Sequence, residues 1–322
     1  MLILILYMLF ASTFTIGKAV LDYTSPIFFI GIRMVSAGLL LLSYQYFFNK
    51  KNWRLSAEDL MLFGQLILFH VYIAFTTEYW ALRYVSSGKA CLMYNLSPFL
   101  TALFAYLVLK ERMSGKKWLG LLLGFSGFIP ILVANSQGES QAGMISVLSF
   151  GEVALLISVA SSVYGWVIVK KLIKERGYSP IMVNGVAMSL GGLLALITSF
   201  ALEGRPSILK IISPKDLLGQ SLSYVVHTEL SGITLFLLYT ALLIIIANII
   251  CYNLYGYLLT RYSATFLSFV GFTTPLFAAL FGWIFRGEKE IASGPFLLSV
   301  GIIFCGLFLF YQEELKENAQ RL

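Results

Sequence analysis

Long apolar runs separated by short polar connectors dominate the chain. A helix that crosses the hydrocarbon layer of a membrane needs about 20 residues. The runs are continuously apolar and do not alternate with period two, which favours helices over the strands of a barrel. Ten such runs occur, at residues 2–21, 25–48, 58–80, 86–109, 116–134, 145–169, 180–202, 231–257, 263–285 and 293–311. The pattern predicts an all-α integral membrane protein with ten transmembrane helices.

Composition indicates the same environment. Hydrophobic residues make up 58% of the 322 residues and charged residues 12%, against about half and about a quarter in soluble domains. A soluble globule of this length has too little interior to bury so much apolar side chain. The net charge of +7 does not indicate nucleic acid, because the basic residues lie in short connectors, where they set membrane orientation.

Two of the apolar runs end in the same way. Glu111 follows Pro98 after 13 positions, and Glu288 follows Pro275 after the same 13. Three positions of the second run also recur in the seventh, 154 residues later: Pro26, Gly31 and Gly38 correspond to Pro180, Gly185 and Gly192. The chain is therefore expected to contain two copies of a five-span unit.

Because five is an odd number, the second copy is expected to cross the membrane in the opposite direction. The predicted copies are residues 1–140 and residues 141–322, the latter ending in a short charged tail. Inverted repeats are typical of secondary transporters, whose halves exchange conformations around a midplane site. Lysine and arginine are concentrated in the connectors on the N-terminal side. This bias predicts that both termini are cytoplasmic in a bacterial-type inner membrane.

In their order along the chain, these residues resemble the drug/metabolite transporter superfamily and its ten-span EamA-type branch. The first copy carries the resemblance in Pro26, Arg33, Ala81, Leu82, Tyr84, Ser87, Pro98, Glu111, Gly124 and Gly127, and the second copy in Gly151, Pro180, Ala264, Pro275, Glu288, Gly301 and Gly306. The resemblance implies a basket of ten helices that works by alternating access. It also implies a central cavity lined largely by spans one, three, four, six, eight and nine. It does not specify the substrate, because members move amino acids, sugars, nucleotide derivatives and drugs.

Four charged residues lie in or beside the apolar runs of the first copy, in its predicted outer half: Lys18, Arg33, Glu78 and Lys89. A charge near the bilayer centre costs roughly 2.5–3.5 kcal/mol, so it is paired, faces a cavity or reaches the interface. One interpretation is a salt bridge between Glu78 and Lys89 that fastens the hairpin of spans three and four. The other is recognition of a zwitterionic ligand, with its cation on Glu78 and its anion on Lys89 or Arg33. The second copy has no charge at the matching positions, which favours ligand or proton handling.

Aromatic and amide side chains near the implied cavity are further candidates for substrate binding: Trp80, Tyr94, Tyr252, Tyr255 and Asn248. Most aromatic residues in such helices pack against lipid or form interfacial belts, and a membrane amide commonly bonds to a neighbouring helix. Aromatic faces beside a carboxylate also suit an adenine ring, a sulfonium or an ammonium group. The resemblance makes S-adenosylmethionine one candidate substrate, because some superfamily members in intracellular bacteria carry it. Ordinary amino acids are equally compatible with these residues.

Four residues are candidates for coupling or movement. Glu78 and Glu152 are candidates for proton coupling, although Glu152 alternatively marks a helix end. Pro98 and Pro275 interrupt backbone hydrogen bonds within their runs, either as gating hinges or as static kinks. Glu111, at the end of a span, is expected to cap a helix or to pair with a nearby cation.

The remaining residues argue against an enzyme. The three cysteines lie inside apolar runs without a close pair, the two histidines are far apart, and no Walker A, HExxH or GxSxG pattern occurs. We expect no catalytic residue, metal or cofactor, and no nucleic-acid partner. The predicted function is secondary active transport of a small polar, zwitterionic metabolite, an amino acid or a derivative of one. A multidrug or lipid flippase of the same fold and a membrane-embedded enzyme are the alternatives. Expected partners are the substrate, membrane lipids and a coupling proton or counter-substrate, for a monomer or homodimer.

Overall fold

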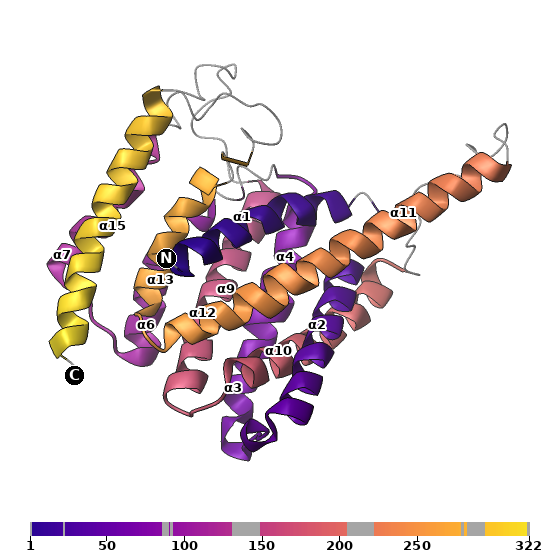
Figure 1. The fold of residues 1–322 in the computed structure, drawn as a ribbon, viewed down its shortest axis with the longest axis horizontal. Helices are drawn as coiled ribbons and strands as arrows, with labels where there is room; N and C mark the ends of the chain where they lie inside the picture. The colour runs from indigo at the N-terminus through magenta and orange to yellow at the C-terminus, as the bar shows by residue number, and fades with distance from the viewer. Residues whose placement is uncertain are drawn as a thin grey trace.

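The chain folds into a bundle of packed helices (Figure 1). The computed structural model describes residues 2–21, 23–85, 90, 93–130, 149–204, 222–277, 280–281 and 294–320, which contain no strand. The first half contains α1 (Leu2–Val20), α2 (Pro26–Phe48), η1 (Lys50–Asn52), η2 (Ala57–Asp59), α3 (Leu60–Gln65), η3 (Leu66–Ile73), α4 (Ala74–Ala81), α6 (Ser97–Leu109) and α7 (Gly115–Ser126). The second half contains α9 (Phe150–Lys174), α10 (Pro180–Leu202), α11 (Leu222–Leu243), η4 (Ile244–Cys251), α12 (Tyr252–Leu259), α13 (Ala264–Val270), η5 (Gly271–Thr273) and α15 (Gly294–Gln320).

The described α-helices all overlap the predicted apolar runs, which confirms an all-α membrane fold. By length and composition, six stretches suffice to cross a membrane: Pro26–Phe48, Ala57–Ala81, Phe150–Lys174, Pro180–Leu202, Gly232–Leu259 and Phe296–Glu317. Shorter apolar helices lie at Leu2–Thr13, Ser97–Leu109 and Ala264–Phe277. The protein is therefore a multi-pass membrane protein.

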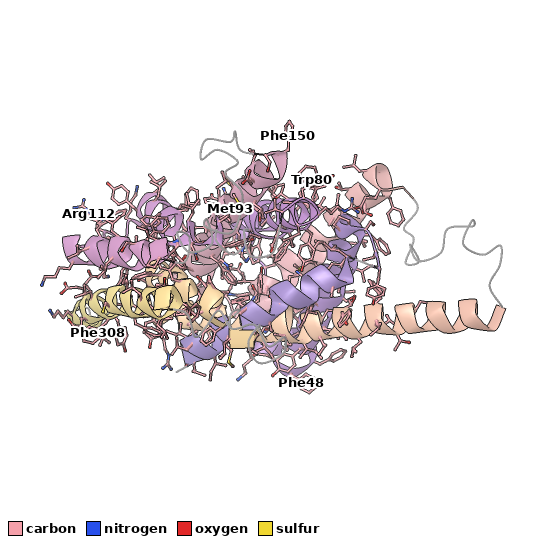
Figure 2. The ribbon with its side chains drawn as sticks, turned by 90° about the horizontal axis from the view of Figure 1, so that it is seen from above. Phe48, Trp80, Met93, Arg112, Phe150 and Phe308 are labelled. Atoms are coloured by element: carbon pink, nitrogen blue, oxygen red, sulfur yellow. The ribbon has the colours of Figure 1, made fainter. Side chains whose placement is uncertain are left out.

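The outside of the bundle is apolar, as lipid requires. Phe48, Phe150 and Phe308 point outward at its periphery in Figure 2, and the side chain of Phe150 is 88% exposed. Polar side chains such as His70 and Asn248 are instead fully buried between helices. This distribution is the reverse of that in a soluble protein, because the surrounding solvent is hydrocarbon.

The helices α2 and α10 pack backbone to backbone around their glycines. A Cβ atom at Gly38 would lie 2.4 Å from the backbone nitrogen of Ser189, and a Cβ atom at Gly192 would lie 2.7 Å from that of Val35. Ser189 follows Val35 by the same 154 positions that separate Gly192 from Gly38. The two contacts are therefore equivalent, and the helices cross about a local pseudo-twofold axis.

A second equivalence concerns two π-helices. The segments η3 (Leu66–Ile73) and η4 (Ile244–Cys251) are both eight residues long and lie in spans three and eight. His70 and Asn248 occupy the same position within them, four residues after each start. Short π-helical segments are rare and are found frequently at functional sites. The same irregularity therefore recurs in both halves.

Spans four and nine each contain a break next to a proline. In span four a turn at Asn95 and Leu96 precedes α6, so Pro98 lies in the first turn of that helix. In span nine the 3-10 turn η5 follows α13 and ends just before Pro275. Proline has no N–H to donate to the carbonyl four residues earlier, and its ring clashes with that group. The predicted interruption by proline thus coincides with a break in both spans.

The C-terminal segment differs from the prediction of a short tail after residue 311. Helix α15 continues to Gln320 and lies beside α7 (Figure 1). A Cβ atom at Gly306 would lie 2.5 Å from the backbone nitrogen of Gly124, so these helices also touch at their backbones. Ion pairs from Lys117 to two glutamates of α15 hold the extension in place. The division into copies 1–140 and 141–322 stays a prediction, because its boundary lies outside the described residues.

Candidate functional site

A cavity lies between the helices at the centre of the bundle. It contains about 1190 Å³ of space between atoms, part of which is continuous with solvent. Its lining comes from α1, α4, the beginning of span four, α9, η4 with α12, and α13 with η5, together with Arg33 of α2. Apart from Arg33, these are the spans that the family resemblance implied.

Two opposite charges line this cavity. Arg33 of α2 is 2% exposed and Glu78 of α4 is 8% exposed. The guanidinium Nη1 of Arg33 donates to the hydroxyl oxygen of Tyr79 at 2.9 Å, whereas its Nε has no hydrogen-bond partner. No ion pair within 4.0 Å joins Arg33 to a carboxylate in the part of the chain that the structure describes. Within the described ranges, the guanidinium therefore lacks a counter-charge in direct contact.

Aromatic rings take the place of that counter-charge. The Arg33 guanidinium carbon lies 5.4 Å from the ring centre of Phe29, 5.1 Å from that of Phe75 and 5.3 Å from that of Tyr79. The negative face of an aromatic ring attracts a cation, by about 2 kcal/mol or more when the pair is desolvated. A ring cannot supply the directed acceptors that a carboxylate offers. The site can accept an anion at Arg33.

The carboxylate of Glu78 is held by a tyrosine. The hydroxyl of Tyr94 donates to Glu78 Oε2 at 3.0 Å and lies 3.1 Å from Ser158 Oγ. The Ser158 hydroxyl donates to the backbone oxygen of Ala74 at 2.8 Å. These contacts tie α4, span four and α9 together beside the cavity. A carboxylate accepts several hydrogen bonds, so Glu78 can also receive a donor from a ligand.

A cluster of aromatic rings lines another part of the cavity. The ring of Trp166 in α9 stacks on Tyr255 in α12, with centres 4.0 Å apart and planes inclined by 28°. The ring of Tyr252 lies 4.9 Å from Trp166 and is inclined by 42°. All three residues line the cavity. The predicted candidates Tyr252 and Tyr255 are thus brought together with a tryptophan.

Behind this cluster lies His70 of η3. Its ring meets Trp166 edge to face at 4.5 Å and lies 5.4 Å from Tyr252. Its Nδ1 lies 3.2 Å from the backbone oxygen of Ser162, and a Cβ atom at Gly165 would lie 2.2 Å from His70 Cβ. The side chain of His70 is buried within the bundle.

Two predicted binding residues do not line the cavity. The ring of Trp80 lies 4.9 Å from Tyr84 on the other side of the span. The amide nitrogen of Asn248 donates to the sulfur atoms of Met34 at 3.1 Å and Met188 at 3.5 Å, and its Oδ1 has no partner. Met188 follows Met34 by 154 positions. Asn248 therefore bridges equivalent residues of α2 and α10, a helix-packing role.

The remaining candidates occupy different environments. Glu152 forms a capping box with Ser149 at the start of α9, where each side chain bonds to the other residue's backbone nitrogen. Lys89 lies outside the described residues, as does Glu288, so the predicted salt bridge with Glu78 stays a prediction. Pro98 and Pro275 follow the two span breaks.

Sequence reasoning missed several cavity residues, among them Trp166 and Asn95. Asn95 is 4% exposed, lines the cavity at the break in span four, and its Nδ2 has no hydrogen-bond partner. The available signal was an amide in an apolar run three residues before Pro98, which cannot donate a backbone hydrogen bond to the carbonyl four residues earlier. Trp166 lies in span six, one of the spans that the resemblance implied to line the cavity.

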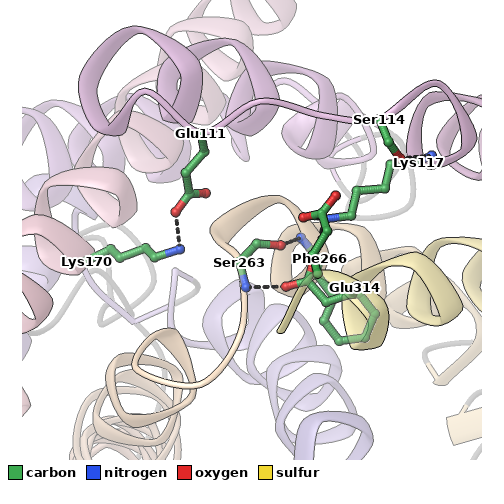
Figure 3. A network of polar contacts seen from close by, with 8 residues as sticks. Glu111, Ser114, Lys117, Lys170, Ser263, Phe266 and Glu314 are labelled. Carbon is green, nitrogen blue, oxygen red and sulfur yellow. Dashed lines mark hydrogen bonds and ion pairs between the residues drawn. The ribbon is translucent and has the colours of Figure 1, made fainter. Parts of the chain in front are cut away.

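Away from the cavity, ion pairs connect the ends of several spans (Figure 3). Lys170 Nζ lies 2.5 Å from Glu111 Oε1, which confirms that Glu111 pairs with a nearby cation. Lys117 Nζ lies 2.7 Å from Glu314 Oε2, and Glu314 Oε1 accepts from the backbone nitrogen of Ser263 at 2.7 Å. The network joins α6, α7, α9, α13 and α15 at one end of the bundle.

Comparison with known proteins supplies a family. The model of the EamA-like transporter family matches residues 1–133 and 149–312. An S-adenosylmethionine/S-adenosylhomocysteine transporter of Chlamydia muridarum is 32% identical over 96% of this chain and 90% of that protein. One of the same name from Chlamydia trachomatis serovar L2 is 31% identical over 96% of this chain and 88% of that protein. A crystal structure with 15% sequence identity superposes with a TM-score of 0.69 over 98% of this chain and 97% of its own, so the fold is shared.

Proposed function

Because the chain belongs to the EamA-like transporter family and is a membrane transporter, we propose that it carries a zwitterionic metabolite of the S-adenosylmethionine type by alternating access. The observation that carries this proposal is the pair Arg33 and Glu78. Both side chains are buried and line one cavity, and no direct ion pair joins them. A small amino acid or another amino-acid derivative would satisfy the same two charges.

The two charges define where the amino-acid part of the substrate binds. A buried charge without a counter-charge is costly, and a substrate carboxylate on Arg33 removes that cost there. An ammonium group on Glu78 adds a charge-assisted hydrogen bond. The free Nε of Arg33 supplies a donor for one carboxylate oxygen. Because water competes with these contacts only while the cavity is open, the bound zwitterion is favoured most in the closed state.

The adenosyl class of substrate is favoured by two further observations. Relatives that match 96% of this chain carry S-adenosylmethionine and S-adenosylhomocysteine in their names. The cavity also combines a carboxylate with the clustered rings of Trp166, Tyr252 and Tyr255, and aromatic faces attract sulfonium and ammonium cations. A cavity for a plain amino acid would not need that aromatic area.

The paired breaks in spans four and nine are the proposed hinges. Asn95 lies in one break and Gly271 in the other, and both line the cavity. Pro98 and Pro275 weaken the helix at these points, so each span can change direction beside the substrate. In the proposed cycle, the copies 1–140 and 141–322 exchange conformations and so open the cavity to each side in turn.

The proposed driving force is exchange against a counter-substrate. S-adenosylhomocysteine shares the amino-acid and adenosyl parts of S-adenosylmethionine, so one site accommodates both. Proton coupling through Glu78 is the alternative that the same experiment separates. We place the protein in a bacterial-type cytoplasmic membrane with both termini cytoplasmic, on the basis of the lysine-rich and arginine-rich connectors.

The test is uptake by purified protein in liposomes. Labelled S-adenosylmethionine should accumulate in vesicles preloaded with S-adenosylhomocysteine, and much less in empty vesicles. Unlabelled methionine, S-adenosylhomocysteine and a lipid analogue are added as competitors. Dependence on a pH gradient with empty vesicles would point to proton coupling instead. Competition by the lipid analogue alone would support the flippase, and would contradict the proposal.

A further inference from the structure

The aromatic cluster and Asn95 provide a face and an edge for one flat ligand group. Trp166 and Tyr255 stack at 4.0 Å, and Tyr252 lies beside them at 4.9 Å. These side chains come from α9 and α12 and line the same cavity as Arg33 and Glu78. We infer that Trp166 and Tyr252 stack on a purine base, and that Asn95 donates a hydrogen bond to the edge of that base. This inference rests on the proposed function and assigns the adenosyl end of the substrate.

Asn95 carries the polar half of the argument. Its side chain is almost completely buried, and its Nδ2 has no partner although the residue lines the cavity. An unsatisfied buried donor costs about 1–3 kcal/mol, which a ligand acceptor recovers. A purine offers ring nitrogens as acceptors in the plane of the base, and an asparagine amide reads such an edge in nucleic-acid complexes.

The rings carry the apolar half. Stacking of a base on an aromatic side chain contributes roughly 1–3 kcal/mol to binding, and this contribution depends little on which base is bound. The amino-acid end cannot use these contacts, because a carboxylate and an ammonium group are bound by Arg33 and Glu78. The cavity thus combines charged groups with an aromatic cluster, as an adenosyl amino acid requires.

His70 positions the aromatic end without touching the ligand. It packs against Trp166 and Tyr252, does not line the cavity, and fits against Gly165, where a Cβ atom would lie 2.2 Å away. Because His70 lies in the π-helix η3, its ring packs behind the rings of Trp166 and Tyr252. The glycine therefore provides the space that His70 needs behind the indole ring.

The test measures binding of partial ligands to purified full-length protein. Adenosine carries only the base and ribose, and methionine carries only the amino-acid end. For Trp166→Leu, the Kd for adenosine and for S-adenosylhomocysteine should rise roughly 10- to 100-fold, while that for methionine stays within threefold. Arg33→Gln should show the opposite pattern: the Kd for methionine should rise, and the Kd for adenosine should stay unchanged. Trp118→Leu, at an exposed tryptophan of α7, is the control.

Asn95→Leu provides a second, independent readout. It should raise the Kd for adenosine about 10-fold. The thermal stability of the ligand-free protein should not fall, because the removed donor had no partner. Unchanged adenosine affinity in both Trp166→Leu and Asn95→Leu would overturn the inference. Equal losses for adenosine and methionine, or a wild type that does not bind adenosine, would overturn it as well.

These results are distinguishable from failure of the proposed function. Adenosine binding that is weakened by Trp166→Leu and Asn95→Leu, without uptake of S-adenosylmethionine by liposomes, would support the purine site and contradict the transport proposal. If S-adenosylmethionine is taken up and adenosine neither binds nor competes, the transport proposal stands and the base site fails.

Discussion

Gly38 of α2 lies against the backbone of Ser189 in α10, and a Cβ atom at position 38 would be 2.4 Å from the Ser189 nitrogen. The contact has an equivalent at Gly192 and Val35, so it lies at the crossing of α2 and α10. Small residues that let two membrane helices approach closely are a main source of their association. The position tolerates no side chain without separating the helices.

Gly38→Ala should therefore lower the stability of the folded protein, by about 1–3 kcal/mol. The measurement is the thermal unfolding midpoint of protein purified in detergent. Gly64→Ala is the matched control, because a Cβ atom there would have no neighbour within 4 Å, and alanine is the better helix former. Equal midpoints for the two variants would show that the crossing relaxes easily.

Arg33→Gln and Glu78→Gln should each reduce the affinity for the zwitterionic substrate at least about 30-fold, because each removes one partner of a buried, charged contact. Substrate competition in liposomes measures this loss. Folding should be preserved, since Arg33 has no ion-pair partner within 4.0 Å among the described residues. Glu152→Gln is the control, because Glu152 caps α9. Loss of uptake in Glu152→Gln alone would assign proton coupling to Glu152 and would contradict the substrate site at Arg33 and Glu78.

Replacement of Lys170 by methionine should destabilise the protein by about 3–5 kcal/mol, because it leaves Glu111 without its partner in a largely buried ion pair. The double variant Lys170→Met with Glu111→Gln should recover most of that loss. A double-mutant cycle by thermal unfolding measures the coupling. Additive effects of the two changes would mean that the pair contributes nothing beyond its separate residues.

Pro98→Ala and Pro275→Ala test the hinges. Each change restores an N–H donor at a span break, which should straighten the helix and slow transport about 10-fold, with substrate affinity unchanged. Initial rates and binding are measured on the same preparation. Pro26→Ala is the control, because Pro26 begins its span after the extended residue Ser25, whereas helical residues precede the break before Pro98. Wild-type rates in both variants would identify the prolines as static kinks.

Sequence reasoning recovered part of the cavity because buried charge is visible in an apolar run. Arg33 and Glu78 were candidates on that ground, and Tyr94, Tyr252 and Tyr255 were candidates as aromatic residues near the implied cavity. All five line the cavity. Whether they bind substrate stays a prediction. The family, the all-α membrane fold and the transporter function were also predicted and are confirmed.

The errors in residue choice have a geometric cause. Trp80 was a candidate and its neighbour Tyr79 was not, yet Tyr79 lines the cavity and Trp80 does not. Successive residues of a helix point about 100° apart, and an apolar run that faces lipid on one side and helices on the other carries little periodic signal. Trp166 was missed for the same reason.

The amino-acid sequence by itself determined the membrane environment and the all-α fold class, because both depend on local hydropathy that can be read along one chain. The ten spans and the two copies stay predictions from residue spacing. Only the tertiary structure decided which polar groups share the cavity. Arg33 and Glu78 meet there because α2 and α4 take particular rotations and crossings, which close glycine contacts and the irregular segments η3 and η4 set. Those contacts join residues far apart in the chain, so no local pattern contains them.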